Sequence, residues 1–236
     1  MGLLKFLLQR LGDILYLIYP HLCLACREHQ PPYGEDICVH CKATLPESGF
    51  HLRQENPFTE RFWGKVKIES GAALYLFTKE SRVQHLIHEL KYKGQKQVGE
   101  ILGKRYGYAL RESPFFKDID LIVPVPLHPK KKIIRGYNQS EMFAEGLSES
   151  MNIPILADGL KRLEHSESQT KKHRKERSEN VKEAFAVNRH KQLEGKHILL
   201  VDDVLTTGST LETCASKVLE VPGTRVSLAT IAIAMH

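Results

Sequence analysis

The chain lacks an apolar run long enough to cross a membrane, and it also lacks the features of an exported protein. Its most hydrophobic stretch, residues 3–19, is interrupted by Lys5, Arg10 and Asp13, and no small-residue cleavage site follows it. We therefore expect no signal peptide, no membrane span and a cytoplasmic location. Apolar residues at helical spacing predict an amphipathic helix over residues 1–20. Packing of this helix on the fold and peripheral contact with a membrane or partner both stay open.

The sequence also lacks the phosphate loops of the common nucleotide-binding folds. Neither G-x-x-x-x-G-K-[ST] nor G-x-G-x-x-G after a strand is present, and no internal repeat is visible. A length of 236 residues with 42% hydrophobic residues suits one sizeable core with a small accessory module. The net charge of +6 favours an anionic partner, which charge alone leaves open as a phosphorylated metabolite, a nucleic acid or a membrane surface.

Cysteine is scarce outside one short segment. Four of the five cysteines form two C-x2-C pairs within residues 23–41, a spacing typical of tetrahedral zinc sites. Two disulfides are the alternative, which the absence of an export signal disfavours. No open ligand position is evident, and His21 and His40 are interpreted as neighbours of the site, so we expect a structural zinc. The predicted ligands are Cys23, Cys26, Cys38 and Cys41, whereas Cys214 is expected in the core.

From about residue 70 the pattern alternates between strands and helices. This order predicts right-handed βαβ units, a parallel sheet and helices on both of its faces. In such sheets ligands bind beyond the carboxyl ends of the strands, where the polar residues 126–139 and 202–210 fall. Strands are expected at residues 72–77, 121–125, 153–156, 198–201 and 225–234, and helices at residues 82–90, 102–110 and from 211.

The stretch ILLVDDVLTTGST, residues 198–210, combines a buried strand with two acids and a hydroxyl-rich loop. Asp202 and Asp203 repel each other, which calls for a ligand or a counter-charge. The loop precedes a helix and so forms an anion site, while carboxylates accept hydrogen bonds from vicinal hydroxyls. A phosphorylated ribose satisfies both parts. Helix capping alone would explain Thr210 but not the acids. The loop residues are Thr206, Thr207, Gly208, Ser209 and Thr210.

VDDVLTTGST resembles the phosphoribosyl pyrophosphate motif of type I phosphoribosyltransferases, and the chain from Cys23 to Ile233 resembles the ComF family of competence-associated proteins. The resemblance also rests on the cysteine pairs, on LKYKG and on VPVPLHPKKKIIRGYNQSE. Tyr137, Ser209 and Ser166 stand where Phe, Ala and Thr are common in the family. The spaced set Arg162, Gln169, Arg177, Asn180 and Phe185 completes the shared features.

The resemblance implies an α/β fold, a type I phosphoribosyltransferase-like parallel sheet flanked by helices, with a small N-terminal four-cysteine zinc module. The expected division is an amphipathic helix at 1–20, the zinc-binding module at 21–65 and the phosphoribosyltransferase-like domain at 66–236.

The resemblance also assigns roles to site residues. The Asp pair would hold the ribose hydroxyls, the loop the 5-phosphate, and the region of residues 126–132 and Arg135 the pyrophosphate with magnesium. Because the transition state is oxocarbenium-like, catalysis needs positioning and leaving-group stabilisation, so Asp202, Asp203 and Arg135 are the catalytic candidates. Capping of a surface helix is the alternative for residues 135–139. The other expected substrate-binding residues, besides the loop, are Lys91, Pro126, Lys130, Asn138, Gln139, Arg162 and Arg177.

The charged run at residues 161–177 carries an excess of Lys and Arg. A solvated surface is the ordinary interpretation, and a basic lid that excludes water from the donor is the functional one.

Two functions follow from the resemblance. The first is phosphoribosyl transfer from phosphoribosyl pyrophosphate to an unidentified acceptor in DNA uptake. The second is a non-catalytic competence protein that senses the metabolite and contacts the DNA-uptake machinery or single-stranded DNA through the zinc module. DNA binding is weakly supported, because the basic run has no interleaved aromatic residues for base stacking.

Overall fold

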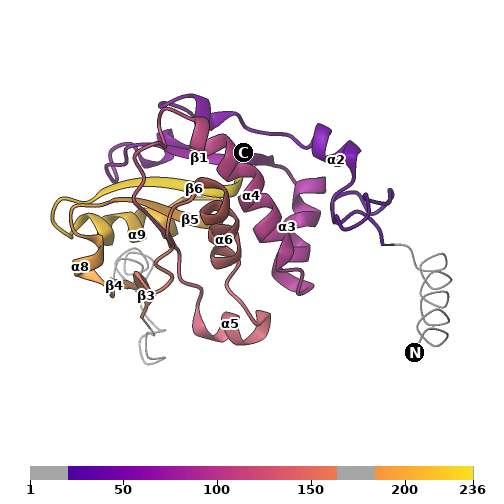
Figure 1. The fold of residues 1–236 in the computed structure, drawn as a ribbon. Helices are drawn as coiled ribbons and strands as arrows, with labels where there is room; N and C mark the ends of the chain where they lie inside the picture. Colours follow the sequence, from indigo (N-terminus) through magenta and orange to yellow (C-terminus); the bar gives the residue numbers. More distant parts are fainter. Residues whose placement is uncertain (1–20, 164–183, 236) are drawn as a thin grey trace, which may run out of the picture.

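A computed structural model describes residues 21–163 and 184–235 of the chain. The predicted N-terminal helix, Arg177 and the lid run from residue 164 onward lie outside these residues. Within them, four parallel strands form one sheet in the order β1-β6-β5-β2 (Figure 1). The α/β class predicted from the sequence is confirmed. The strands are β1 (Gly71–Phe77), β2 (Leu121–Pro124), β5 (His197–Leu205) and β6 (Arg225–Ala234).

Helices cover both faces of the sheet, which explains why its strands are apolar without alternation. In β5, Leu199 and Val201 face a core shared with α3, α4 and α6. Ile198 and Leu200 face a second core, shared with α9. The helices are α3 (Arg82–Tyr92), α4 (Gln97–Glu112), α6 (Gln139–Met151) and α9 (Ser209–Leu219).

The structure differs from the sequence-based expectation in several elements. The predicted strand at residues 153–156 is a single parallel bridge between Ile122 and Ile155. Helix α4 begins five residues before the predicted start, and α6 was not predicted. The two helices approach very closely, since a Cβ added at Gly146 would lie 2.0 Å from the Glu100 carbonyl oxygen. Glycines at this contact add no apolar side chain to the helical pattern. The pattern therefore predicted α4 too short and did not predict α6.

The segment before β1 contacts the sheet in two ways. Glu47 forms an antiparallel bridge with Tyr75 of β1, and Phe58 and Phe62 are buried in the core shared with α9. Residues on the N-terminal side of the predicted 65/66 boundary therefore pack on the sheet, and the boundary itself stays a prediction. The segment contains α2 (Val39–Thr44), η1 (Phe50–Leu52) and η2 (Thr59–Phe62).

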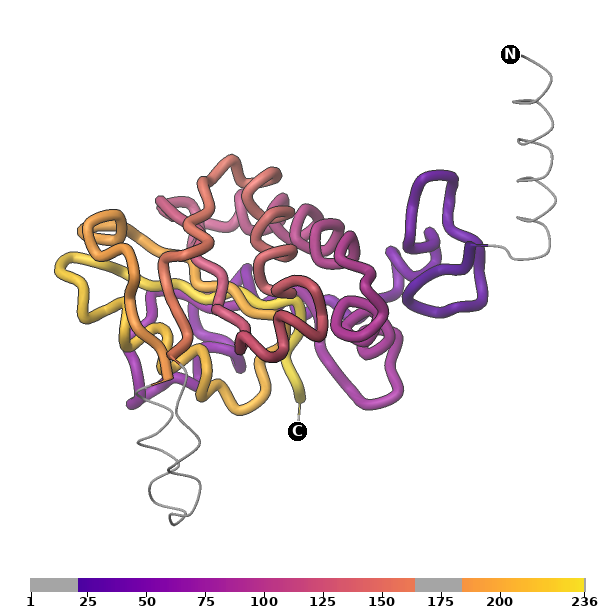
Figure 2. The backbone as a smooth tube through the Cα atoms, turned by 90° about the horizontal axis from the view of Figure 1, so that it is seen from below, coloured from indigo at the N-terminus to yellow at the C-terminus, as the bar shows by residue number. Residues whose placement is uncertain are grey.

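Short elements connect the main strands and helices. Strands β3 (Leu160–Arg162) and β4 (Phe185–Val187) pair antiparallel, and β4 packs against α9. Helix α5 (Pro129–Arg135) projects from the body below α6 in Figure 1, and α8 (His190–Leu193) precedes β5. In the tube view the β3–β4 ribbon lies far from the cysteine-rich segment (Figure 2). Among the described residues, no helix combines the length and hydrophobicity that a membrane crossing requires.

Candidate functional site

The two acids lie inside β5 and not beyond it, which corrects the predicted strand end at residue 201. The strand continues to Leu205 because β6 supplies a parallel partner along this whole stretch. Asp202 is in register with Thr230, and Val204 with Ala232. Backbone pairing on one side thus fixes the acids on a regular strand.

Asp202 is tied into the fold by two hydrogen bonds. Its Oδ1 accepts from Ser140 Oγ at 2.9 Å and from the Asp203 backbone N–H at 2.8 Å. Burial, and then the neighbouring Asp203 charge, raise the pKa of the Asp202 carboxyl to about 7. The carboxyl is therefore only partly ionised near neutral pH until a ligand or cation favours its charged form.

Asp203 has a positively charged partner, as expected from the repulsion between the two neighbouring acids. Lys91 Nζ lies 3.0 Å from Asp203 Oδ1, and both side chains are largely buried. Lys91 is in the last turn of α3, within the LKYKG stretch, so the predicted site residue from this motif does meet the acid pair.

The hydroxyl-rich loop turns directly into α9. Gly208 has φ +88°, a left-handed conformation that suits glycine, and the Phe62 ring lies 3.5 Å from where its Cβ would be. The N-cap residue Gly208 offers no side chain to α9, and Thr207 Oγ1 accepts a hydrogen bond from Ser209 N–H at 3.5 Å. Thr210 lies inside the helix, so capping does not account for this residue. The loop, Asp202 and Leu211 line a small cup of about 30 Å³. The geometry suits an anion bound at a helix N-terminus.

A cavity of about 180 Å³ opens beside this cup. Cations from α3, α5 and β3 face the two acids across it. Its lining includes nine residues named as predicted site residues, together with Lys131, which belongs to the predicted pyrophosphate region 126–132, and Ser140, which was not predicted. Ser140 belongs to the NQSE stretch quoted above. The sequence shows that a hydroxyl is present there, but it does not show that the hydroxyl points toward Asp202. Lys130 does not line the cavity. The predicted lining residues are Lys91, Pro126, Arg135, Asn138, Gln139, Arg162, Asp202, Asp203 and Thr210.

A larger groove of about 590 Å³ is formed by residues 54–69. It shares no lining residue with the acid cavity, and its wall alternates single acids and lysines with apolar residues. It has no convergent set of acceptors and cations, in contrast to the acid cavity.

The segment before α6 is organised by its own side chains. Asn138 caps α6, because its side chain accepts from Ser140 N–H and its amide donates to the Val125 carbonyl at 2.9 Å. Arg135 donates to Gln139 Oε1 at 2.6 Å. The alternative of helix capping is thus confirmed for Asn138, although the residue is buried; contact of residues 135–139 with a ligand stays a prediction.

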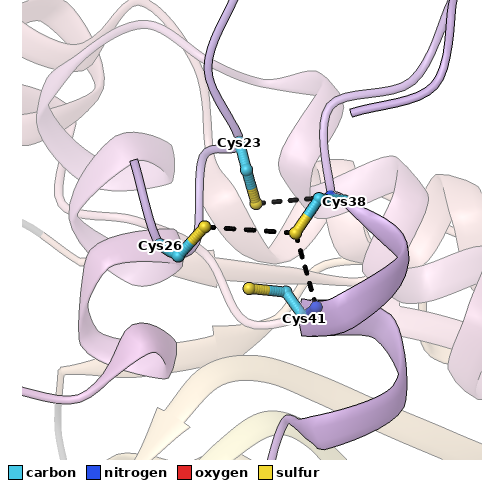
Figure 3. A group of neighbouring side chains, drawn as sticks. All are labelled: Cys23, Cys26, Cys38 and Cys41. Carbon is cyan, nitrogen blue, oxygen red and sulfur yellow. Dashed lines mark hydrogen bonds between the residues drawn. The ribbon is translucent and has the colours of Figure 1, made fainter. Parts of the chain in front are cut away.

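The four N-terminal cysteines converge on one point (Figure 3). Their Sγ atoms all lie within 4.8 Å of one another, and none forms a disulfide. Cys41 N–H donates to Cys38 Sγ and Cys38 N–H to Cys23 Sγ. Three of the four are buried. Four sulfurs at this spacing fit a tetrahedral zinc with no open position, so the residues can hold a structural zinc.

The sequence matches a known domain family and two competence proteins. A family model described as "Phosphoribosyl transferase domain" matches residues 138–236. The chain is 30% identical over 198 residues to Competence protein F of Haemophilus influenzae, covering 80% of each chain. It is 26% identical to Competence protein ComFC of Bacillus subtilis over 210 residues, 87% of this chain and 82% of the relative. A solved glutamine phosphoribosylpyrophosphate amidotransferase from B. subtilis has a TM-score of 0.44 and 19% identity, covering 61% of this chain and 30% of that one.

Proposed function

Because the chain belongs to the ComF family and has a phosphoribosyltransferase-like fold, we propose that it binds phosphoribosyl pyrophosphate with magnesium and transfers the phosphoribosyl group to an acceptor. One observation carries the proposal. A pair of acids, a hydroxyl-rich loop at a helix N-terminus and several cations line two adjoining hollows at the carboxyl ends of β2 and β5. A phosphorylated sugar with a second, larger anionic group matches this arrangement.

Each hollow suits one part of the donor. The cup would take the 5-phosphate, whose oxygens accept from the backbone N–H groups of the loop and of the first turn of α9. Asp202 and Asp203 would accept hydrogen bonds from the two ribose hydroxyls. The pyrophosphate would lie toward Arg135 and Lys131, which line the same cavity as the Asp pair.

The same residues account for the chemistry. The bond from the anomeric carbon to the pyrophosphate breaks, the electron pair leaves with the pyrophosphate, and the acceptor's lone pair forms the new bond as the acceptor loses a proton. Positive charge builds on the ribose and negative charge on the leaving group. Arg135 and Lys131 stabilise the leaving group, and the carboxylates hold the ring and lie near the developing positive charge.

Magnesium would enter with the donor. Among the described residues, no cluster of three or more carboxylates or histidines lies at the acid pair. Magnesium commonly uses one or two carboxylates together with substrate phosphates, and the Asp pair offers such oxygens. When bound, the ion would neutralise part of the pyrophosphate charge.

We also propose the biological setting from the relatives. Both compared relatives carry names of competence proteins, which supports a role in DNA uptake. A non-catalytic competence protein that binds the same metabolite would use the same pocket, so catalysis is the part that needs a direct measurement.

The test is pyrophosphate release from the donor with magnesium, measured across a panel of nucleophiles that includes nucleobases, amines and single-stranded DNA. We expect acceptor-dependent release that Arg135→Ala lowers at least tenfold. Lys217→Ala, which removes an exposed lysine paired with Glu220, is the control. Donor binding without release in any arm would reduce the protein to a metabolite-binding role.

A further inference from the structure

Helix α3 faces the cysteine cluster with one continuous stripe of side chains. Arg82, His85 and Glu89 follow one another at i, i+3 and i+7, which places them on one face. His85 Nδ1 is 2.8 Å from the Ala25 carbonyl oxygen, between the first two cysteines. Arg82 Nη1 lies 3.7 Å from Cys41 Sγ. The helix therefore contacts both cysteine pairs.

The strongest contact in this stripe is the ion pair of Glu89 with Arg27. Arg27 Nη2 lies 2.6 Å from Glu89 Oε1, and the Glu89 side chain is 10% exposed. Arg27 directly follows Cys26 and has φ +59°, a left-handed conformation where glycine is the easier residue. Arg27 thus has a side chain at a turn position where glycine would be less strained, and this side chain pairs with Glu89 of α3.

The next residues of α3 contact the acid cavity. The Leu90 carbonyl accepts a hydrogen bond from the Tyr137 hydroxyl, which belongs to the segment before α6. Lys91 pairs with Asp203, and the Tyr92 ring lies under the Arg135 guanidinium at 5.3 Å. Consecutive residues from Glu89 to Tyr92 thus join the cysteine-rich turn, the Arg135 segment and the Asp pair.

We infer that Glu89 is a positioning residue that couples metal occupancy of the cysteine cluster to ligand binding at the Asp pair. The inference rests on the proposed function for the identity of that ligand. A metal fixes the turn that carries Arg27, Arg27 fixes the last turn of α3, and that turn sets where Lys91 meets Asp203. Because a helix moves as a rigid element, a shift at Glu89 also moves Lys91, which lies two residues further along α3. Reciprocity requires that ligand binding also tighten metal binding by the same factor.

The experiment measures both affinities in the full chain. Donor affinity with magnesium is measured with zinc bound and after chelation, and zinc affinity is measured by chelator competition with and without donor. In the wild type we expect each ligand to tighten the other by about fivefold or more. Glu89→Gln should retain both ligands and lower this factor to less than about twofold. Glu149→Gln, which breaks an exposed pair between α6 and Lys104 of α4, is the matched control and should keep the wild-type factor.

Two further variants test the inference if Glu89→Gln alone does not fold. Arg27→Gly removes the guanidinium and suits the left-handed turn, and Arg27→Gly with Glu89→Gln also removes the unpaired buried carboxylate. Both should fold, bind zinc and lose the coupling. Wild-type coupling in folded Glu89→Gln, or equal donor affinity of the zinc-bound and zinc-free wild type, would overturn the inference while leaving the proposed function intact.

Hydrogen exchange separates this inference from the proposed function. If the wild type binds no donor, the function proposal fails, and the coupling is judged without ligand. Removing zinc should then raise amide exchange at residues 88–93 and 136–140 as well as near the cysteines. A rise confined to residues 21–45 would overturn the coupling.

Discussion

Ser140 Oγ donates a 2.9 Å hydrogen bond to Asp202 Oδ1, which joins the first turn of α6 to the acid pair of β5. Hydrogen bonds to a carboxylate favour its charged form. The bond opposes the burial and the Asp203 charge, which together raise the pKa of Asp202. Ser140 is therefore placed to keep this acid available as an acceptor.

We predict that Ser140→Ala shifts donor binding to higher pH. Without the hydroxyl, the pKa of Asp202 rises further, so at pH 7 more of the protein has a protonated acid and donor affinity falls by about two- to tenfold. Above pH 8.5 most of the affinity returns. Calorimetric titration across pH checks this. Ser148→Ala, on the same helix but bonded to the Ile153 carbonyl, is the control. An affinity loss that is equal at all pH values would contradict the prediction.

The pH dependence of stability gives a second prediction. The folded protein retains the Asp202 proton to about pH 7, whereas an ordinary Asp releases it near 3.8. This group therefore costs stability progressively as pH rises through that window. Asp202→Asn keeps the Oδ1 acceptor and removes the ionisation, so unliganded protein should gain about 1 kcal/mol or more at pH 8 and little at pH 4, near the ordinary pKa of Asp.

Thermal melts of the wild type and Asp202→Asn at both pH values test this prediction. The substitution leaves the neighbouring groups of Asp202 in place. The charged groups are Asp203 and Lys91 of α3. The buried Cys214 of α9 also faces the acid, and burial raises the pKa of its thiol, which stays neutral. Asp158→Asn is the control, because Arg189 holds the pKa of that exposed acid low, and it should give no gain at pH 8. Equal stabilisation by Asp202→Asn at both pH values would refute the ionisation argument.

Zinc stoichiometry tests the cysteine cluster. Cys38→Ser should lower bound zinc from one equivalent toward zero and destabilise the protein, because the site loses a thiolate and zinc sites contribute directly to folding. Cys214→Ser replaces a buried cysteine outside the cluster and should leave the stoichiometry unchanged. Normal zinc content in Cys38→Ser would exclude the four-cysteine site.

The predicted domain boundary can be tested by truncation. A chain that begins at residue 66 loses Phe58 and Phe62, which are 0% and 1% exposed. Loss of one such core side chain costs about 3–5 kcal/mol, so this fragment should not fold cooperatively. A chain that begins at residue 46 keeps both rings and the Glu47 bridge to β1, and should melt cooperatively. A cooperative melt of the shorter fragment at the temperature of the longer one would contradict this expectation and support the 65/66 boundary.

Local patterns predicted the central elements of the site, and tertiary packing determined the rest. Asp202, Asp203 and the loop follow from a strand, a polar turn and a helix in succession, which the sequence displays directly. The length of β5 depended on β6, since only a partner strand shows that the acids stay in register. Strands of three residues, such as β3 and β4, carry too little periodicity to be recognised.

The directions in which side chains point could not be predicted from the sequence either. Lys91 was expected from the resemblance, but its pairing with Asp203 depends on where α3 ends relative to β5. Lys131 and Ser140 enter the cavity because of the orientation of α5 and α6, which no spacing rule supplied. Asn138 illustrates the reverse case, because the side-chain oxygen of this predicted ligand residue caps α6 and its amide nitrogen donates to the Val125 carbonyl.

The central claim is that Asp202 and Asp203 bind the ribose of phosphoribosyl pyrophosphate, and ligand-induced thermal stabilisation tests it most directly. At a hundredfold excess over the dissociation constant, donor with magnesium should stabilise the wild type by about 2.7 kcal/mol. In a chain of this size that raises the melting temperature by roughly 5–10 °C. Asp202→Asn and Asp203→Asn should each lose most of this shift, because an amide replaces one acceptor oxygen with a donor. A wild-type shift in both variants would contradict the account.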